Sequence, residues 1–351
     1  MDKKILAIMH EFGLDPATYA ADIFGSGLIH QTYLVSKNGT AAYILQQVNH
    51  HVFKRPEDIS HNLHIMGNFL SVHAPEYPFT FPVAAESGSD YVMSDGNYFR
   101  MFRFIPGTHT MDTCQQPEHA HEAALEFGRF TATLNDLRTD MLRYTIPGFH
   151  DLSSRYIDFT RSLEQGDATR LEESRDTARW LSAHKEIAQQ YDKITHGNDF
   201  LKRVTHHDTK ISNVLLDQNN KGVCVIDLDT VMPGYFFSDL GDMIRSMACI
   251  NDEDSREFDR IKIRKDYYNA IVSNYLSVMG NQLTASEKKY IHYAGLLMVY
   301  MQALRFLTDY LNGDIYYRTN YPDQNFDRAM NQYVLLMRLE EWLLPDSPTN
   351  G

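Results

Sequence analysis

A short run of strand-like sequence interrupts the otherwise helical second part of the chain, and it constrains the fold more than any other feature. Residues 214–216 and 223–226 are rich in apolar and β-branched side chains, and the polar turn between them predicts a hairpin. Polar residues collect at the ends of these strands, where a rigid scaffold can present them to a ligand. The chemistry of the chain is therefore expected at this hairpin.

The polar residues around the hairpin follow the spacing His206-x-Asp208-x4-Asn213, and Asp227 follows the second strand. Phosphoryl transfer needs a carboxylate that accepts the proton of the attacking hydroxyl, together with oxygen ligands that hold Mg²⁺ against the nucleotide phosphates. An amide and a carboxylate are the hard oxygen ligands that suit this ion. The first spacing alone is a weak signal, but the downstream Asp and a glycine-rich hairpin upstream strengthen it.

Other interpretations of this segment stay open. Each polar residue could be an ordinary turn residue, and His207 could be only a spacer, since the pattern leaves its position free. His206, His207 and Asp208 could also form a transition-metal cluster, as in a metal hydrolase. Adjacent histidines in an extended loop point in different directions, which argues against that cluster.

The first hundred residues predict a compact α+β unit with an antiparallel sheet and one helix. Asn38-Gly39 is a strong turn signal between strands at 31–35 and 42–46, and a glycine-rich turn precedes the first of these. Pro56 opens a helix whose apolar face, at helical spacing, consists of Ile59, Leu63, Met66 and Leu70. Three further strands are expected at 80–84, 91–93 and 98–105.

The remainder of the chain is predicted to be mainly helical. Helices are expected from Pro117, over 171–194, near Asp239, and over 268–279, 286–311 and 327–344. We expect two domains, 1–105 and 106–351, because 351 residues suit two packed units.

Composition limits the kinds of binding partner that this chain can have. Its formal net charge is -13, so it lacks the basic surface that is typical of a nucleic-acid binder or a polybasic membrane anchor. Three widely spaced cysteines without a CxxC pair fit free thiols in a reducing compartment, and no signal peptide or membrane span is evident. We therefore expect a cytoplasmic protein, a monomer or weak homodimer, whose partners are small molecules.

The chain resembles the aminoglycoside phosphotransferase and choline kinase superfamily, and within it the N-acetylhexosamine 1-kinases. The resemblance covers nearly the whole chain. It is most specific at Ile-Asp-Leu-Asp-Thr-Val-Met-Pro-Gly (226–234) and at Arg-Phe-Leu-Thr-Asp-Tyr-Leu (305–311), and it includes 28–35 with 43–47. It implies a two-lobed protein-kinase-like fold of the α+β class. The lobe 1–105 would bind the nucleotide, and the larger helical lobe 106–351 would carry catalysis and substrate binding.

The resemblance also implies roles for individual residues. Asp208 would be the catalytic base, Asn213 and Asp227 would hold Mg²⁺ or Mn²⁺, and Asp229 would support a second ion or the substrate. The residues implied for binding ATP, the co-substrate, are Gly25, Ser26, Gly27, Leu28, Gln46, Phe102 and Phe104. Those implied for the sugar are His30, Asp208, Arg305 and Tyr316.

Several of these roles have plainer alternatives. Arg305 could form an ion pair with Asp309 one helical turn away, and Tyr316 could simply pack in the core. Asp239 could buttress the catalytic loop or could be an ordinary helix cap. Gln46 stands where most kinases of this kind place a phosphate-binding Lys; the N-acetylhexosamine kinase pattern shares this Gln.

Together these observations predict an ATP-dependent kinase that phosphorylates a sugar hydroxyl, foremost the anomeric hydroxyl of GlcNAc or GalNAc. One alternative is an aminoglycoside or amino-alcohol kinase of the same fold, with carboxylates such as Asp309, Asp314 and Asp323 facing the ammonium groups. Another is a non-catalytic nucleotide- or sugar-binding module, for which the missing Lys would matter most.

Overall fold

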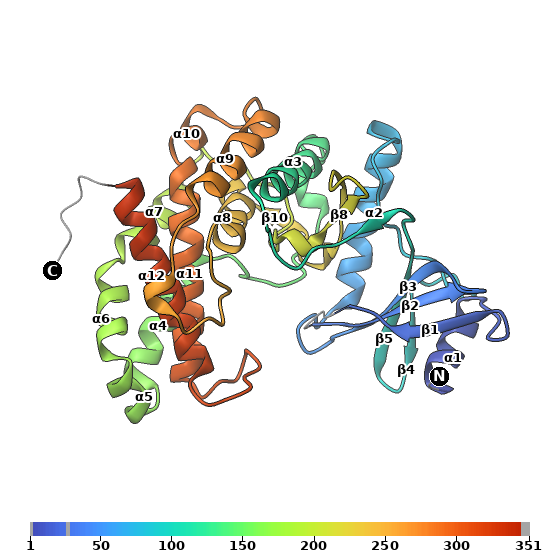
Figure 1. Ribbon diagram of the computed structural model, residues 1–351, viewed down its shortest axis with the longest axis horizontal. Helices are drawn as coiled ribbons and strands as arrows, with labels where there is room; N and C mark the ends of the chain where they lie inside the picture. Colours follow the sequence, from blue (N-terminus) through green and yellow to red (C-terminus); the bar gives the residue numbers. More distant parts are fainter. Residues whose placement is uncertain (1–2, 26–28, 345–351) are drawn as a thin grey trace. The chain divides into compact units, whose positions relative to one another are not determined.

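The computed structural model describes residues 3–25 and 29–344 (Figure 1). The chain divides into two compact units that are discontinuous in sequence. The first comprises residues 1–110, 136–147 and 215–233, and the second comprises 111–135, 148–214 and 234–351. The sequence suggested contiguous segments meeting at residue 105, whereas the contacts assign two later segments to the first unit. The division of function between the segments stays a prediction.

A five-stranded antiparallel sheet forms the centre of the first unit. Its strands lie in the order β1-β2-β3-β5-β4. Asn38 and Gly39 have φ of 50° and 82°, which is the left-handed geometry that a tight hairpin turn between β2 and β3 requires. The bounds are β1 Tyr19–Ile23, β2 Gln31–Lys37, β3 Thr40–Val48, β4 Tyr91–Ser94 and β5 Asn97–Arg103.

The observed strands differ from the expected ones in two places. Residues 80–84 form no strand, only an isolated bridge between Pro82 and Phe102, because a proline has no N–H to donate to a ladder. The strand β1 was not expected, since Ala20, Ala21 and Asp22 give its sequence little β-propensity. It forms because β2 offers a complete antiparallel register.

Two helices complete this unit. The helix α1 (Lys3–Glu11) contributes Ile5, Ile8 and Met9 to a core that it shares with the strand residues Val35 and Leu45. The helix α2 (Pro56–His73) begins at the proline, as expected, and buries the predicted face of Ile59, Leu63, Met66 and Leu70. A second small sheet joins β6 (Thr108–His109), β8 (Val214–Asp217) and β9 (Gly222–Val225), which explains why 215–233 belongs to this unit.

The second unit is mainly helical, as the sequence predicts. Its central helix α11 (Ile291–Leu311) is buried along most of its length and packs against α4, α8 and α12. Gly241 of α8 permits this packing, because a Cβ there would lie 2.2 Å from the Ala294 carbonyl oxygen. The other helices are α3 Pro117–Thr133, α4 Leu152–Gln165, α5 Ala168–Glu173, α6 Arg175–Ala183, α7 Glu186–Thr195, α8 Phe236–Met247, α9 Lys265–Met279, α10 Ala285–Lys289 and α12 Gln324–Leu343.

The helix boundaries differ from the predictions in three places. The single helix expected over 171–194 is divided into α5, α6 and α7, and the one expected over 286–311 is divided at Tyr290. The helix α4 was not anticipated. Two short strands, β7 (Arg203–Thr205) and β10 (Met232–Gly234), flank the polar segment that carries the candidate site. Within the described residues no helix is long and apolar enough to cross a membrane.

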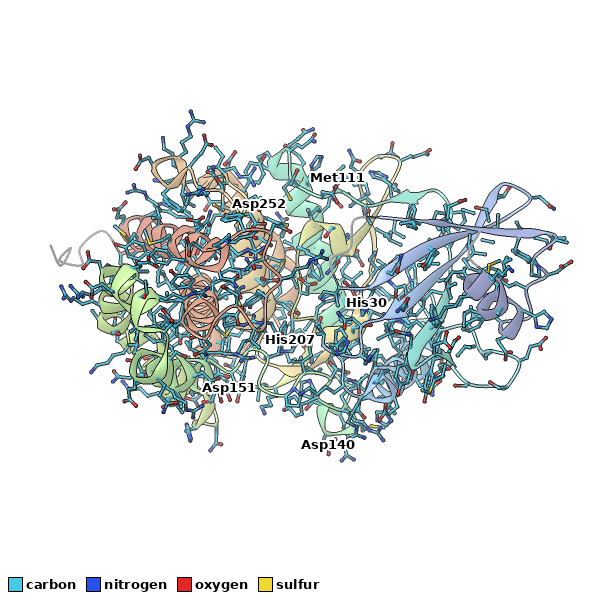
Figure 2. The ribbon with its side chains drawn as sticks, turned by 90° about the horizontal axis from the view of Figure 1, so that it is seen from below. His30, Met111, Asp140, Asp151, His207 and Asp252 are labelled. Carbon is cyan, nitrogen blue, oxygen red and sulfur yellow. The ribbon has the colours of Figure 1, made fainter. Side chains whose placement is uncertain are left out.

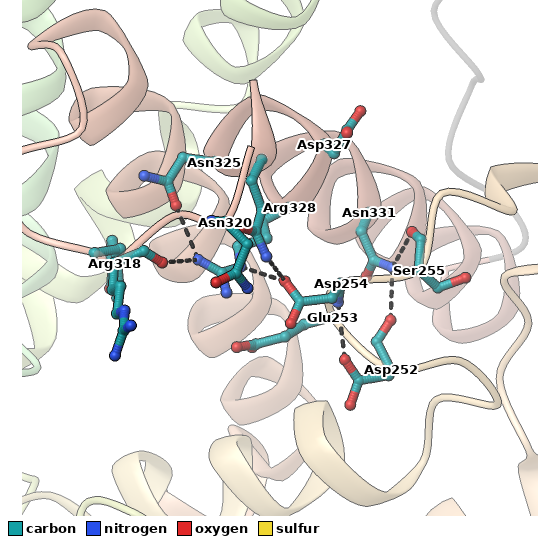
Figure 3. Close-up of polar contacts among 12 residues, drawn as sticks. Asp252, Glu253, Asp254, Ser255, Arg318, Asn320, Asn325, Asp327, Arg328 and Asn331 are labelled. Carbon is teal, nitrogen blue, oxygen red and sulfur yellow. Dashed lines mark hydrogen bonds and ion pairs between the residues drawn. The ribbon is translucent and has the colours of Figure 1, made fainter. Parts of the chain in front are cut away.

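Side chains of α12 hold the loop that precedes α9 (Figure 3). Arg328 Nε donates to Asp254 Oδ1 at 2.5 Å, and Asn331 Nδ2 donates to the carbonyl oxygens of Asp252 and Ser255 at 3.0 and 3.1 Å. The two bonds of Asn331 reach backbone carbonyls of a loop that has no helix or sheet ladder to bond them.

A buried ion pair anchors β7 to α10. The Arg203 guanidinium donates to both carboxylate oxygens of Glu287, at 2.6 and 2.9 Å, and the two side chains are 2% and 0% exposed. Removing one partner of such a pair leaves the other charge buried and uncompensated.

We therefore expect Glu287→Ala to lower the free energy of unfolding by about 3–5 kcal/mol. Urea denaturation measures this change. The matched control is Glu341→Ala, whose partner Arg338 lies on the exposed surface, and it should cost about 1 kcal/mol or less. Similar losses in the two variants would contradict the assignment.

Candidate functional site

The polar segment after β7 is organised by a carboxylate at the start of α8. The Asp239 carboxylate accepts the backbone N–H groups of His206 and His207 at 2.9 and 2.8 Å. Asp239 is 1% exposed, so these bonds form away from solvent. Asp239 therefore buttresses the loop that carries Asp208, one of the two roles the sequence left open. Figure 2 labels His207 within this loop.

His207 adopts a backbone conformation that few non-glycine residues take, with φ of 66°. Its ring packs so closely on Gly234 that a Cβ at this glycine would lie 2.6 Å from His207 Nε2 and 2.2 Å from Thr205 Oγ1. Only glycine fits there, which gives a physical reason for the last residue of the Met-Pro-Gly stretch. His207 is thus a structural part of the loop and more than a spacer.

The imidazole of His206 is enclosed by aromatic rings. It meets Phe127 edge-on at 5.1 Å between ring centroids and Phe130 at 6.2 Å, and its Nδ1 accepts the N–H of Asp208. Among the residues that the structure describes, the one group with metal-ligand geometry includes neither His206 nor His207. The arrangement disfavours a metal hydrolase built on these histidines.

Asp208 is held between a cation and an amide. Its Oδ2 lies 3.1 Å from Lys210 Nζ and accepts Asn213 Nδ2 at 2.9 Å, and its side chain is 25% exposed. Burial acts to raise the pKa of Asp208, but Lys210 and these hydrogen bonds outweigh it and leave the pKa below its ordinary value. The carboxylate is ionised at neutral pH and can accept a proton.

The second unit also contains a group that we call the arginine–aromatic cluster. The Arg305 guanidinium lies 5.1 Å from the Phe149 ring centroid, 5.8 Å from that of Tyr316 and 5.4 Å from that of Tyr317. The neighbouring ring of His150 lies 5.1 Å from that of His207, which connects the cluster to the loop that carries Asp208. The members are Phe149, His150, Arg155, Arg305, Tyr316 and Tyr317.

The charges of this cluster are positive. Arg305 donates to the Gln302 side-chain oxygen, and Arg155 donates to the carbonyl oxygens of Gly148 and Phe149. Burial lowers the pKa of His150, and the positive charges of its neighbours lower it further, so this ring is neutral. Burial and then Arg305 also lower the pKa of Arg155.

Asp309 has a different role from the ion pair that the sequence allowed. Its carboxylate accepts the N–H groups of residues 315, 316 and 317 at 3.0, 2.7 and 2.9 Å and so fixes the loop after α11. This loop presents Tyr316 with 57% of its surface exposed, so core packing does not explain that residue. Asp309 thereby fixes the position of Tyr316 next to Arg305.

A second set of polar residues lies within the first unit. Asp229 accepts both terminal nitrogens of Arg100, at 2.5 and 2.9 Å, and His30 Nε2 at 2.8 Å. Because the Asn49 N–H donates to His30 Nδ1, the proton of the neutral ring is on Nε2 and points to Asp229. Gln46 accepts two further N–H groups of Arg100. We call these four residues, His30, Gln46, Arg100 and Asp229, the Asp229 network.

Asp227 lies two residues before Asp229 in the sequence. Its backbone has left-handed geometry, with φ of 60° and ψ of 56°. One ligand atom from each of His30, Asp227 and Asp229 lies within 4.8 Å of the others. Burial acts to raise the pKa of Asp229, but Arg100 and His30 more than offset it and hold the pKa well below its usual range. Carboxylate oxygens suit Mg²⁺, so Asp227 has the chemistry of a metal ligand, whereas the oxygens of Asp229 already accept Arg100 and His30.

The residues expected to bind ATP are only partly described. Gly25 has φ of 77°, while Ser26, Gly27 and Leu28 lie outside the described residues. Phe102 lies on β5, and the N–H of Phe104, just beyond the strand, donates to Ala42. The nucleotide contacts of these residues stay predictions, as do the sugar contacts of His30, Arg305 and Tyr316.

Sequence reasoning missed Arg100, Lys210, His150 and Arg155. A Lys two residues after the candidate base was a usable signal. Arg100 could be found only from the strand register, and the other two depend on tertiary packing. None has a motif of its own.

A sequence model of the phosphotransferase enzyme family matches residues 21–266 of this chain. Solved structures share the fold at low identity. An aminoglycoside phosphotransferase from Alicyclobacillus acidocaldarius aligns with TM-score 0.62 and 15% identity over 95% of each chain. A spectinomycin phosphotransferase in complex with ADP and spectinomycin aligns at 0.61 and 13%, covering 97% of this chain and 98% of that one. A choline kinase from Cryptosporidium parvum aligns at 0.60 and 14%, covering 98% and 96%.

These matches agree with the observed architecture, an N-terminal antiparallel sheet followed by a larger helical part in a kinase-like fold of the α+β class. The fold predicted from the sequence is confirmed.

The protonation of Asp239 offers a test of this site. Burial raises the pKa of Asp239 to about 6, against the lowering effect of the two backbone N–H donors. An Asp in the unfolded chain has a pKa of about 3.9. Between these values the folded chain binds more protons at Asp239 than the unfolded chain, so stability from this group falls as the pH rises.

We expect the wild type, relative to Asp239→Asn, to lose about 2 kcal/mol of unfolding free energy between pH 4 and pH 7. Denaturant titrations at several pH values measure the difference. Asp217→Asn is the control, because backbone N–H donation from Lys221 lowers the pKa of Asp217. The contribution of Asp217 to stability should therefore rise with pH, opposite to that of Asp239. Parallel pH profiles for wild type and Asp239→Asn would contradict the raised pKa.

Proposed function

Because the chain belongs to the phosphotransferase enzyme family, we propose that it transfers the γ-phosphoryl group of ATP to a hydroxyl of a free sugar, foremost the anomeric hydroxyl of an N-acetylhexosamine. The observation that carries this proposal is the ionised Asp208, fixed by Lys210 and Asn213 on a buttressed loop. A carboxylate held in this way can accept the proton of an attacking hydroxyl.

The residues of the two units have separate parts in the proposed reaction. Asp208 orients the sugar hydroxyl and takes its proton. Asp227 and the side-chain oxygen of Asn213 are each a proposed ligand of Mg²⁺ brought with the nucleotide. Bound Mg²⁺ would neutralise charge on the phosphates. Gly25 and the following turn are proposed to lie over those phosphates.

The charge of the arginine–aromatic cluster supports a sugar acceptor over an amine. An ammonium group near Arg155 and Arg305 would be repelled, whereas a sugar offers hydroxyl and amide oxygens to guanidinium donors. Phe149 and Tyr316 add apolar ring faces against which a sugar can pack. We propose this cluster as the acceptor site, with Arg305 and Tyr316 as sugar contacts.

An amino-alcohol or aminoglycoside acceptor is the second candidate, and one feature favours it. A hollow of about 520 Å³ in the second unit is lined by the carboxylates of Glu173, Asp323 and Asp327, by the guanidinium of Arg256 and by three aromatic rings. Such a lining suits an ammonium group. Two of the carboxylates, however, already accept hydroxyls of the lining tyrosines Tyr310 and Tyr321.

An acceptor panel tests the proposal directly. The protein is incubated with MgATP and, separately, with GlcNAc, GalNAc, other free hexoses, choline, ethanolamine and an aminoglycoside, and both ADP and phosphorylated product are measured. We expect sugar 1-phosphate, and no activity once EDTA removes the metal. Turnover confined to the amines would replace the proposed acceptor by the second candidate.

Variants of two arginines connect the panel to the cluster. Arg305→Ala removes charge-assisted hydrogen bonds to the acceptor, so it should raise the KM for the sugar roughly tenfold or more. Arg318→Ala, an exposed arginine of the loop between α11 and α12, is the matched control and should leave KM unchanged. Equal KM values in the two variants would argue against this acceptor site.

The assignment of Asp208 leads to a separate prediction. Asp208→Asn keeps the shape of the side chain but removes its basicity, so kcat should fall by at least roughly a hundredfold, while nucleotide affinity stays near wild type. Steady-state kinetics and calorimetry measure the two quantities. Asp217→Asn, at the far end of β8, is the control. Near-normal turnover in folded Asp208→Asn would exclude Asp208 as the base.

A further inference from the structure

We propose that Arg100 is a positioning residue that supplies, from β5, the fixed cation that related kinases take from a Lys on the preceding strand of the sheet. In this role it holds the segment of Asp227 and Asp229 in its metal-binding conformation. The inference rests on the proposed function and deepens it. It also explains why a kinase of this family can have Gln46 in place of a Lys.

The strand register places Arg100 directly beside the position of the missing Lys. The strands β3 and β5 are antiparallel neighbours, and Gln46 pairs with Arg100 across them. Residues directly opposite in an antiparallel pair extend their side chains to the same face of the sheet. A cation at position 100 can therefore occupy the region that a Lys at position 46 would otherwise fill.

The contacts of Arg100 show a guanidinium fixed on every side. Its Nη1 and Nη2 donate to the two oxygens of Asp229, and its Nε and Nη2 donate to Gln46 Oε1 at 3.1 and 2.9 Å. Its carbon Cζ lies 5.1 Å from the Phe102 ring centroid. Only 6% of the residue is exposed. A forked donor of this kind fixes orientation as well as charge.

The same ion pair reaches the metal-binding segment. Asp229 lies two residues after Asp227, whose left-handed backbone conformation is uncommon for a residue with a side chain. Asp229 also accepts His30 Nε2. Arg100 therefore holds Asp229, and through it both the conformation of Asp227 and the position of the His30 ring.

Gln46 becomes a consequence of this arrangement. Its amide oxygen accepts two N–H groups of Arg100, and its Nε2 lies 3.4 Å from Thr32 Oγ1. A Lys at this position would place a second positive charge against the guanidinium in a poorly solvated region, which is unfavourable. Either position 46 or position 100 can therefore carry the required cation. Cations at both positions would repel each other.

A purely structural ion pair would behave differently from a positioning residue. Loss of a structural pair would lower the stability of the fold, but it would change the affinity for ADP equally with and without Mg²⁺. Loss of the positioning role would reduce the gain in affinity that Mg²⁺ provides, because Asp227 would no longer be held as a ligand. The measured quantity is therefore the ratio of ADP affinities with and without Mg²⁺.

Four chains, wild type, Arg100→Met, Gln46→Lys and the double variant, are compared by calorimetric ADP binding with saturating Mg²⁺ and with EDTA. We expect the Mg²⁺-dependent gain in affinity to fall about tenfold or more in each single variant, because a charged contact is lost or a like charge is added. In the double variant the introduced lysine replaces the lost cation, so the gain should recover to within a few-fold of wild type. Arg103→Met, an exposed arginine on the same strand, is the matched control and should leave it unchanged.

Several outcomes would overturn the inference. One is a folded double variant whose gain falls as far as the two single changes combined, since the introduced lysine would then not substitute for Arg100. If Arg100→Met does not fold, Arg100→Gln combined with Asp229→Asn removes both charges while keeping similar shapes; an unchanged gain in that variant would also overturn it. The ADP-binding experiment contains no acceptor, so it does not depend on the acceptor proposed above. If wild type binds MgADP but phosphorylates no sugar in the panel, only the proposed acceptor is refuted.

Discussion

The buried Asp239 carboxylate accepts two consecutive backbone N–H groups, and the conformation of the segment that carries Asp208 depends on this interaction. These bonds allow His207 to keep a left-handed conformation, and this residue turns the chain so that Asp208 follows it. Strain of this kind persists only where the surroundings determine the conformation. Gly234 supplies the rest of the constraint, because no larger residue leaves room for the His207 ring.

The elements that the sequence predicts well are those determined by local chemistry. The Asn38-Gly39 turn and the proline that opens α2 follow from the backbone preferences of these residues, and both are confirmed. The errors arise where tertiary structure overrides propensity. The strand β1 forms on a weak sequence because β2 offers it a register, and residues 80–84 form only an isolated bridge although their composition resembles a strand.

The same distinction applies to the candidate site. The spacing of Asp208 and Asn213 is readable because both residues lie on one short loop, and the structure joins them by hydrogen bonds. The pairing of Arg100 with Asp229 spans 129 positions, and it depends on which residue of β5 faces Gln46. No local sequence pattern encodes that register. The sequence alone therefore does not distinguish Arg100 from the other polar residues of its strand.

The distribution of charge gives the remaining argument about function. The chain has a net charge of -13, yet the guanidiniums of Arg155 and Arg305 donate to carbonyl and amide oxygens next to one another. Close positive charges that donate to neutral oxygens disfavour folding, and such local conflicts concentrate at functional sites. Oxygen atoms of a bound acceptor would relieve the conflict, whereas an ammonium group would increase it. The electrostatics of this cluster therefore support the proposed oxygen-rich acceptor over an amine.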